Sequence, residues 1–200
     1  MEIGTLEVIT GCMFSGKTES LIERSNQYDA RLVQAFKPRI DDRYSRIEIV
    51  SHAGKSIPCA PVDRATEIYH RAHPQSQLIL IDEAQFFDSE LVEITHQLVL
   101  KNYNVVVAGL DMDWQGQGFG PMPELLVHAD VVTKLAAECA ICKKPAQRTQ
   151  RLVANREDIL VGGSEQYEPR CRVHHNPRAV KLAAKRTNNY DQYGEANDVL

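Results

Sequence analysis

The sequence predicts an α/β domain in which helices flank a mainly parallel sheet. One observation is that short apolar runs alternate along the chain with segments of helical periodicity. A second is that the runs 78–81 and 105–110 are almost continuously apolar, as expected of strands buried on both faces. The chain has 200 residues, which suits one such domain with a small appended module.

The elements expected of this sheet all lie before residue 136. We expect strands at the apolar segments 6–9, 33–36, 47–51, 56–62, 78–81, 105–110 and 131–135. Helices are expected where apolar residues recur at helical spacing, at 17–28, 63–72 and 89–101. Pro38 should end the second strand because proline cannot continue a ladder, and Gly54 should form the turn before 56–62. Asp63 is the expected N-cap of the helix that follows it.

Composition and charge argue against two kinds of partner. The formal net charge is −4, which disfavours broad binding to nucleic acid or to an anionic membrane. The N-terminal segment lacks the basic and apolar regions of a signal peptide, and no apolar run approaches the roughly 18 residues of a membrane span. We therefore expect a cytoplasmic protein with no nucleic acid and no membrane as a partner.

A glycine-rich segment follows the first expected strand and opens the first expected helix. It reads GCMFSGKT and matches G-x-x-x-x-G-K-[ST], the P-loop of nucleotide-binding proteins. Glycines let backbone N–H groups approach phosphate oxygens, and the helix dipole favours the same anion. Lys17 would reach the β- and γ-phosphates of ATP, and the Thr18 hydroxyl would bind Mg²⁺. A chance glycine turn is less plausible in this strand-to-helix context. The residues expected to hold the phosphates are Gly11, Cys12, Met13, Phe14, Ser15, Gly16, Lys17 and Thr18.

An acidic pair follows the apolar run 78–81. Asp82 would hold Mg²⁺ directly or through water, and Glu83 could accept a proton from the group that attacks the γ-phosphate. Ala84 and Gln85 complete the segment expected at the nucleotide. The pair alone would also fit a solvated turn, and Glu83 could activate water in an ATPase driven by nucleic acid. The small size and negative charge of the chain count against such a motor.

Four side chains have the spacing of a structural zinc site. The chain has five cysteines, and an odd count is a poor basis for a disulfide framework. Cys139-x-x-Cys142 and Cys171-x-x-His174 are two close pairs of the kind that gather four tetrahedral ligands around Zn²⁺. His175 competes for the fourth place, but His174 repeats the spacing of the first pair. Buried thiols with surface histidines are the alternative. Because all four candidates are protein groups, the metal would be structural.

The composition changes after residue 135, which suggests three parts. Residues 1–135 form the expected α/β domain of the P-loop NTPase type. Residues 136–184 are richer in cysteine, lysine, arginine and glycine and form the expected zinc-binding domain. Residues 185–200 are polar and aperiodic, which predicts a C-terminal tail without a packed core.

Several segments in order resemble one family, the type II thymidine kinases. The similarity covers roughly residues 5–180. Its most specific marks are GCMFSGKT (11–18), KPRIDDRYS (37–45), DEAQFF (82–87), GLDMDWQGQGFGPMPEL (109–125), the Cys/His set and GGSEQYEPRC (162–171).

The resemblance implies an activity and a role for named residues. The γ-phosphate of ATP would pass to the 5′-hydroxyl of thymidine, and also of deoxyuridine, in nucleotide salvage for DNA synthesis. Glu83 would be the general base, with Lys17 and Arg43 beside the reacting phosphate. The zinc-stapled segment would be a lasso domain that closes over the nucleoside. The nucleoside pocket would be formed by Met13, Phe86, Leu110, Trp114, Phe119, Thr149, Leu160, Val161, Gly162, Gly163 and Tyr167. The family is usually a homotetramer and is inhibited by thymidine triphosphate.

Two positions depart from the family pattern. Cys12 stands where proline is expected after the first P-loop glycine, and Trp114 stands where phenylalanine or tyrosine is usual. The larger indole could tighten the nucleoside pocket.

Two other classes of function compete with the kinase. One is an ATPase that remodels a macromolecule, and the other is a zinc-ribbon nucleic-acid binder with a nucleotide switch. A kinase predicts ATP consumption that rises with thymidine, and a motor predicts stimulation by a polymer. A binder predicts salt-sensitive association with DNA or RNA without turnover.

Overall fold

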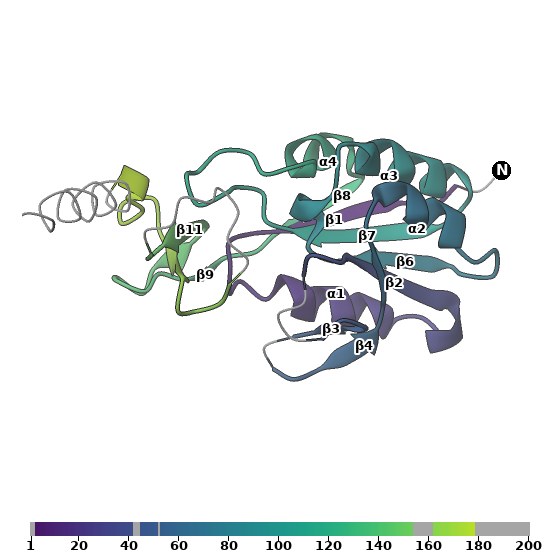
Figure 1. Cartoon of the computed structure of the whole chain (residues 1–200), viewed down its shortest axis with the longest axis horizontal. Coiled ribbons are helices and arrows are strands. Elements are labelled where there is room, and N and C mark those ends of the chain that lie inside the picture. The colour runs from purple at the N-terminus through teal and green to yellow at the C-terminus, as the bar shows by residue number, and fades with distance from the viewer. Residues whose placement is uncertain (1–2, 42–44, 52, 154–161, 179–200) are drawn as a thin grey trace, which may run out of the picture.

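The computed structural model describes residues 3–41, 45–51, 53–153 and 162–178. Its main sheet has six strands in the order β5-β2-β6-β7-β1-β8, and every neighbouring pair is parallel (Figure 1). This confirms the predicted parallel sheet. In chain order its strands are β1 (Leu6–Thr10), β2 (Val33–Pro38), β5 (Ala60–Val62), β6 (Leu78–Ile81), β7 (Asn104–Gly109) and β8 (Val131–Lys134).

Helices cover both faces of this sheet, as Figure 1 shows. One face is covered by α1 (Lys17–Ser25) and by a hairpin of β3 (Glu48–Val50) and β4 (Ser56–Pro58). The other is covered by α2 (Ala65–Arg71), α3 (Glu90–Leu100) and α4 (Met122–His128). Two short 3₁₀ helices, η1 (Ala30–Leu32) and η2 (Ala84–Phe86), lie in the connections.

The alternation of side chains along β6 explains its continuous apolar sequence. Ile79 and Ile81 join the cluster under α2, α3 and α4, whereas Leu78 and Leu80 join the cluster under α1. All four side chains are at most 1% exposed. A strand buried on both faces needs apolar residues at every position, because neither face reaches water.

The segment after β8 forms two small antiparallel sheets. They pair β9 (Ala137–Glu138) with β10 (Pro145–Ala146), and β11 (Arg148–Arg151) with β12 (Tyr167–Arg170). Both lie beyond the carboxyl end of β1 (Figure 1). A domain boundary near residue 136 stays a prediction. Across the described residues, every helix is too short or too polar to cross a bilayer.

The structure corrects the expected strand at 56–62. The segment is two strands separated by Cys59. β4 pairs with β3 in the hairpin, and β5 pairs with β2 in the main sheet. One apolar run therefore serves two sheets, which its periodicity cannot reveal.

Helix boundaries also differ from those expected. α2 begins at Ala65 with Arg64 as its N-cap, so the prediction of Asp63 was wrong. The Glu67 carboxylate accepts hydrogen bonds from the backbone N–H groups of Asp63 (2.8 Å) and Arg64 (3.3 Å), which supplies the cap from inside the helix. α1 ends at Ser25 rather than residue 28.

α4 was not predicted from the sequence. The helix contains Pro123 in its first turn, and its N-cap is Pro121. Proline is favoured at the start of a helix because the first N–H groups have no acceptor within the helix.

Candidate active site

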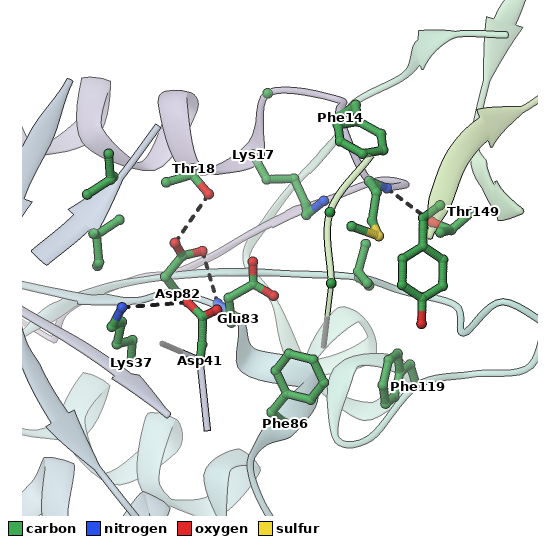
Figure 2. Close-up of a pocket in the computed structure, with 18 of the residues that line it drawn as sticks. Phe14, Lys17, Thr18, Lys37, Asp41, Asp82, Glu83, Phe86, Phe119 and Thr149 are labelled. Atoms are coloured by element: carbon green, nitrogen blue, oxygen red, sulfur yellow. Dashed lines mark hydrogen bonds and ion pairs between the residues drawn. The ribbon is translucent and has the colours of Figure 1, made fainter. Parts of the chain in front are cut away.

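The carboxyl ends of four parallel strands surround one cavity of about 380 Å³ (Figure 2). The P-loop follows β1, Lys37 is the penultimate residue of β2, Asp82 follows β6 and Leu110 follows β7. In open α/β sheets this edge is where ligands bind. The P-loop and the acidic pair flank β7, because β7 pairs with both β1 and β6.

The P-loop has the backbone geometry that its glycines allow. Gly16 is the N-cap of α1 and has a φ of 86°, in the left-handed region. Gly11 lies so near Leu135, the residue after β8, that a Cβ there would be 2.5 Å from the Leu135 carbonyl oxygen. The Lys17 Nζ donates to the carbonyl oxygen of Cys12 at 2.8 Å. Burial lowers the pKa of Lys17, and the charge of Glu83 opposes this shift.

The side-chain oxygen atoms of Thr18 and Asp82 lie close together beside the P-loop. The Thr18 hydroxyl donates to Asp82 Oδ2 at 3.2 Å, and Asp82 Oδ1 accepts the backbone N–H of Glu83 at 2.9 Å (Figure 2). Burial and then the charge of Glu83 raise the pKa of Asp82 above its ordinary value. A divalent cation would relieve this repulsion, and hydroxyl and carboxylate oxygens are ligands that Mg²⁺ accepts. The pair therefore fits the predicted magnesium site.

Glu83 is held in an unusual backbone conformation. Its φ of 51° and ψ of 40° are left-handed, although it is not glycine. The Gln85 side chain fixes the carboxylate, because its Nε2 donates to Glu83 Oε2 at 2.5 Å and its Oε1 accepts the Leu110 N–H at 2.9 Å. Figure 2 shows the Glu83 carboxylate directed into the cavity between Lys17 and Phe86. Strain of this kind is often found at functional positions.

Aromatic and apolar side chains form the other half of the cavity. Phe86 and Phe119 meet edge to face, with ring centroids 5.6 Å apart. Thr149 on β11 accepts the backbone N–H of Met13 at 3.1 Å, so the small sheets are tied directly to the P-loop.

Most of the residues predicted at the site line this cavity. Those that do are Met13, Phe14, Gly16, Lys17, Thr18, Asp82, Glu83, Phe86, Leu110, Trp114, Phe119, Thr149, Gly162, Gly163 and Tyr167. The cavity lining does not include Gly11, Cys12 and Ser15 of the P-loop or Ala84 and Gln85 of η2. Arg43, Leu160 and Val161 lie outside the described residues.

The polar residues that line the cavity near the end of β2 were not predicted from the sequence. Lys37 is 3% exposed, its Nζ lies 3.6 Å from the Asp41 carboxylate, and it also donates to the carbonyl oxygen of Ser45. Lys37, Asp41 and Glu48 all line the cavity (Figure 2 labels the first two). A lysine at the carboxyl end of a parallel strand was a usable signal, because that edge carries the site.

The four predicted zinc ligands come together. Their ligand atoms all lie within 4.8 Å of one another. Cys142 Sγ and Cys171 Sγ are 3.7 Å apart, and His174 Nδ1 lies 3.3 Å from Cys171 Sγ and 3.8 Å from Cys139 Sγ. Tetrahedral zinc requires about 3.8 Å between sulfur atoms and about 3.5 Å between sulfur and nitrogen. The set therefore fits zinc.

The competing histidine is engaged elsewhere. His175 Nε2 lies 3.0 Å from the carbonyl oxygen of Trp114. A carbonyl oxygen only accepts, so this nitrogen carries the proton and donates. This geometry favours His174 as the fourth ligand.

Comparison with known proteins agrees with this site. The sequence matches the family model described as "Thymidine kinase" over residues 4–175. It is 48% identical over 181 aligned residues to a protein named "Thymidine kinase" from Onion yellows phytoplasma (strain OY-M), with 86% of this chain and 87% of that protein covered. On this evidence the chain belongs to the thymidine kinase family.

Proposed function

We propose that this protein transfers the γ-phosphate of ATP to the 5′-hydroxyl of thymidine. The observation that carries the proposal is the position of Glu83, whose carboxylate enters the cavity between the P-loop lysine and the aromatic wall. A kinase needs a base between the phosphate donor and the acceptor alcohol. Membership of the family supports thymidine as the acceptor.

The chain's own groups can carry each step of the transfer. Amide N–H groups at the start of α1 and the Lys17 ammonium would hold the phosphates and balance their charge. Glu83 would take the proton of the 5′-hydroxyl as its oxygen bonds to the γ-phosphorus. The bond from that phosphorus to the bridging oxygen of ADP breaks, and ADP leaves. Bound Mg²⁺, held by Thr18 and Asp82, would supply positive charge to the phosphate oxygens.

The aromatic half of the cavity would bind the nucleoside and exclude water. Phe86 and Phe119 offer flat apolar surfaces to a pyrimidine, and Thr149, Gly162 and Gly163 come from the segment after β8. Water must be excluded because it competes with the sugar alcohol for the phosphate. We infer that a structural zinc at Cys139, Cys142, Cys171 and His174 holds the ends of this covering segment.

Four further expectations rest on the family resemblance. They are phosphorylation of deoxyuridine, inhibition by thymidine triphosphate, assembly as a homotetramer and a cytoplasmic location. Arg43 and the lasso residues Leu160 and Val161 keep their proposed roles beside the phosphate and the base.

Measurement of ATP turnover against a panel of acceptors tests the function. The panel contains thymidine, deoxyuridine, deoxycytidine, adenosine and single-stranded DNA, and the phosphorylated product is separated by chromatography. We expect thymidine to stimulate ADP formation, with one thymidine 5′-monophosphate formed per ADP. Stimulation by DNA without stimulation by thymidine would favour the motor. Salt-sensitive DNA binding without turnover would favour the nucleic-acid binder.

A further inference from the structure

Trp114 is the only tryptophan in the chain, and it lies on the cavity wall in the loop between β7 and α4. Two residues from the segment after β8 contact it. The Arg151 guanidinium lies over its ring, 5.2 Å from the centroid. His175 Nε2 donates to its carbonyl oxygen at 3.0 Å. One contact fixes the ring and the other fixes the backbone.

Arg151 is positioned by a strand that is anchored on both faces. Thr149, Gln150 and Arg151 are consecutive on β11 and are 4%, 5% and 1% exposed. Alternation places Thr149 and Arg151 on one face, where Thr149 accepts the N–H of Met13. Gln150 points the other way and holds Asn176 through two hydrogen bonds, of 2.7 Å and 3.2 Å.

His175 is positioned by the metal cluster. It directly follows His174, and the backbone N–H groups of both residues lie within 3.1 Å of the Cys171 carbonyl oxygen. Cys171 and His174 are two of the four proposed zinc ligands. The turn that presents a ligand to the metal therefore also presents His175 to Trp114.

We propose that Arg151 and His175 are positioning residues for Trp114, and that the zinc cluster sets the place of this indole in the pocket wall through them. The part of this proposal that concerns nucleoside binding rests on the proposed function. The coupling between metal and indole does not, because it follows from contacts within the chain.

If the zinc cluster positions Trp114 in this way, the width of the nucleoside pocket depends on that cluster. A cation over an indole face is most stabilising where water is excluded, and Arg151 is almost fully buried. Without these contacts the indole can turn away from the cavity, so nucleoside binding weakens. The phosphate groups near Lys17 are held by other elements. The KM for thymidine should therefore rise while the KM for ATP and kcat change little.

The emission of Trp114 gives a direct readout without substrate, because no other tryptophan contributes. We expect His175→Ala and Arg151→Met to shift its emission to longer wavelength and to increase acrylamide quenching. Removal of zinc from the unmodified protein by a chelator should cause the same shift. In His175→Ala the further shift on chelation should be smaller. In kinetics, each variant should raise the KM for thymidine about fivefold, the factor typical of one lost cation–π contact or hydrogen bond.

Two matched variants separate positioning from general damage. His175→Gln keeps an N–H donor near the Trp114 carbonyl and should restore the emission and the KM. His96→Ala removes an exposed histidine on α3 and should change neither. Zinc content and circular dichroism show whether each variant is folded. Unchanged Trp114 emission in folded His175→Ala, or after complete zinc removal, would overturn the proposal. Absence of thymidine turnover with the expected emission shifts would instead refute only the proposed function.

Discussion

Glu83 combines a proposed chemical role with a strained backbone, and its carboxylate is the most specific feature of the site. We expect Glu83→Gln to lower kcat by ~10²-fold or more, the usual scale for loss of a general base. ATP binding should be nearly unchanged, because the P-loop is intact. Calorimetric ATP titration and steady-state kinetics measure the two effects. Glu93→Gln, the same change on the exposed face of α3, is the control. A normal kcat in Glu83→Gln would show that Glu83 is not the general base.

The backbone strain at Glu83 leads to a separate prediction about the unfolding stability of variants at this position. Its left-handed φ of 51° is easy for glycine and costs other residues about 1 kcal/mol. Glu83→Gly should therefore be more stable than Glu83→Ala by about that amount, although both lack the base and should be nearly inactive. Urea unfolding of the two variants checks this. Equal stabilities would mean that residue 83 leaves the left-handed region when its side chain is removed.

At the level of elements, the sequence predicted the helices and strands whose apolar pattern or motif is uninterrupted. β6 is a continuous apolar run, β7 is apolar after Asn104, and the P-loop lies at the predicted junction of β1 and α1. The split at Cys59 was not predictable from periodicity, because β4 and β5 are adjacent in sequence but pair with strands of different sheets. α4 was missed because its prolines suggest a loop, whereas proline is compatible with a first helical turn.

One polar cluster links β1, α1 and β8 by hydrogen bonds, and its contribution to folding stability depends on pH. The Glu7 carboxylate on β1 accepts two hydrogen bonds from Arg24 on α1, at 2.8 Å and 2.9 Å, and one from Thr133 on β8, at 3.1 Å. The hydrogen bonds from Arg24 are the main reason why the pKa of Glu7 lies below its ordinary value of 4.5. The charged form therefore stabilises the fold above that pH, and the contribution is lost as the pH falls through the lowered pKa.

We expect Glu7→Gln to reduce the free energy of unfolding at pH 7 by about 1 kcal/mol, after allowance for partial exposure of the pair. The difference between this variant and the unmodified protein should begin to shrink as the pH falls below 4.5, where Glu7 of the unfolded chain takes up a proton, and should vanish below the lowered pKa of the folded protein. Denaturant unfolding at several pH values measures both. Glu90→Gln, at an exposed position on α3, is the matched control. A constant difference down to pH 3 would contradict the assignment.

At the scale of the whole molecule, the site combines strand ends of the main sheet with Thr149, Gly162, Gly163 and Tyr167 from the segment after β8. Motifs located the P-loop, the acidic pair and the metal ligands, because each is a local pattern. The roles of Arg151 and His175 depend on their contacts with Trp114, which is far from both residues in sequence. Local patterns do not record such contacts, and only the fold brings them together.

The metal cluster should therefore act on the nucleoside half of the site more than on the phosphate half. In Cys139→Ser we expect loss of bound zinc and a KM for thymidine that rises by about tenfold or more, the scale seen when metal-site support is removed. The KM for ATP should change much less, because Lys17 and Thr18 lie on α1. Cys59→Ser makes the same substitution between β4 and β5, away from the cluster, and should keep its zinc. Metal analysis and kinetics on both variants decide the matter. Full zinc content in Cys139→Ser would refute the ligand assignment. An equal rise in the KM for thymidine and the KM for ATP would show that the metal cluster supports the whole cavity.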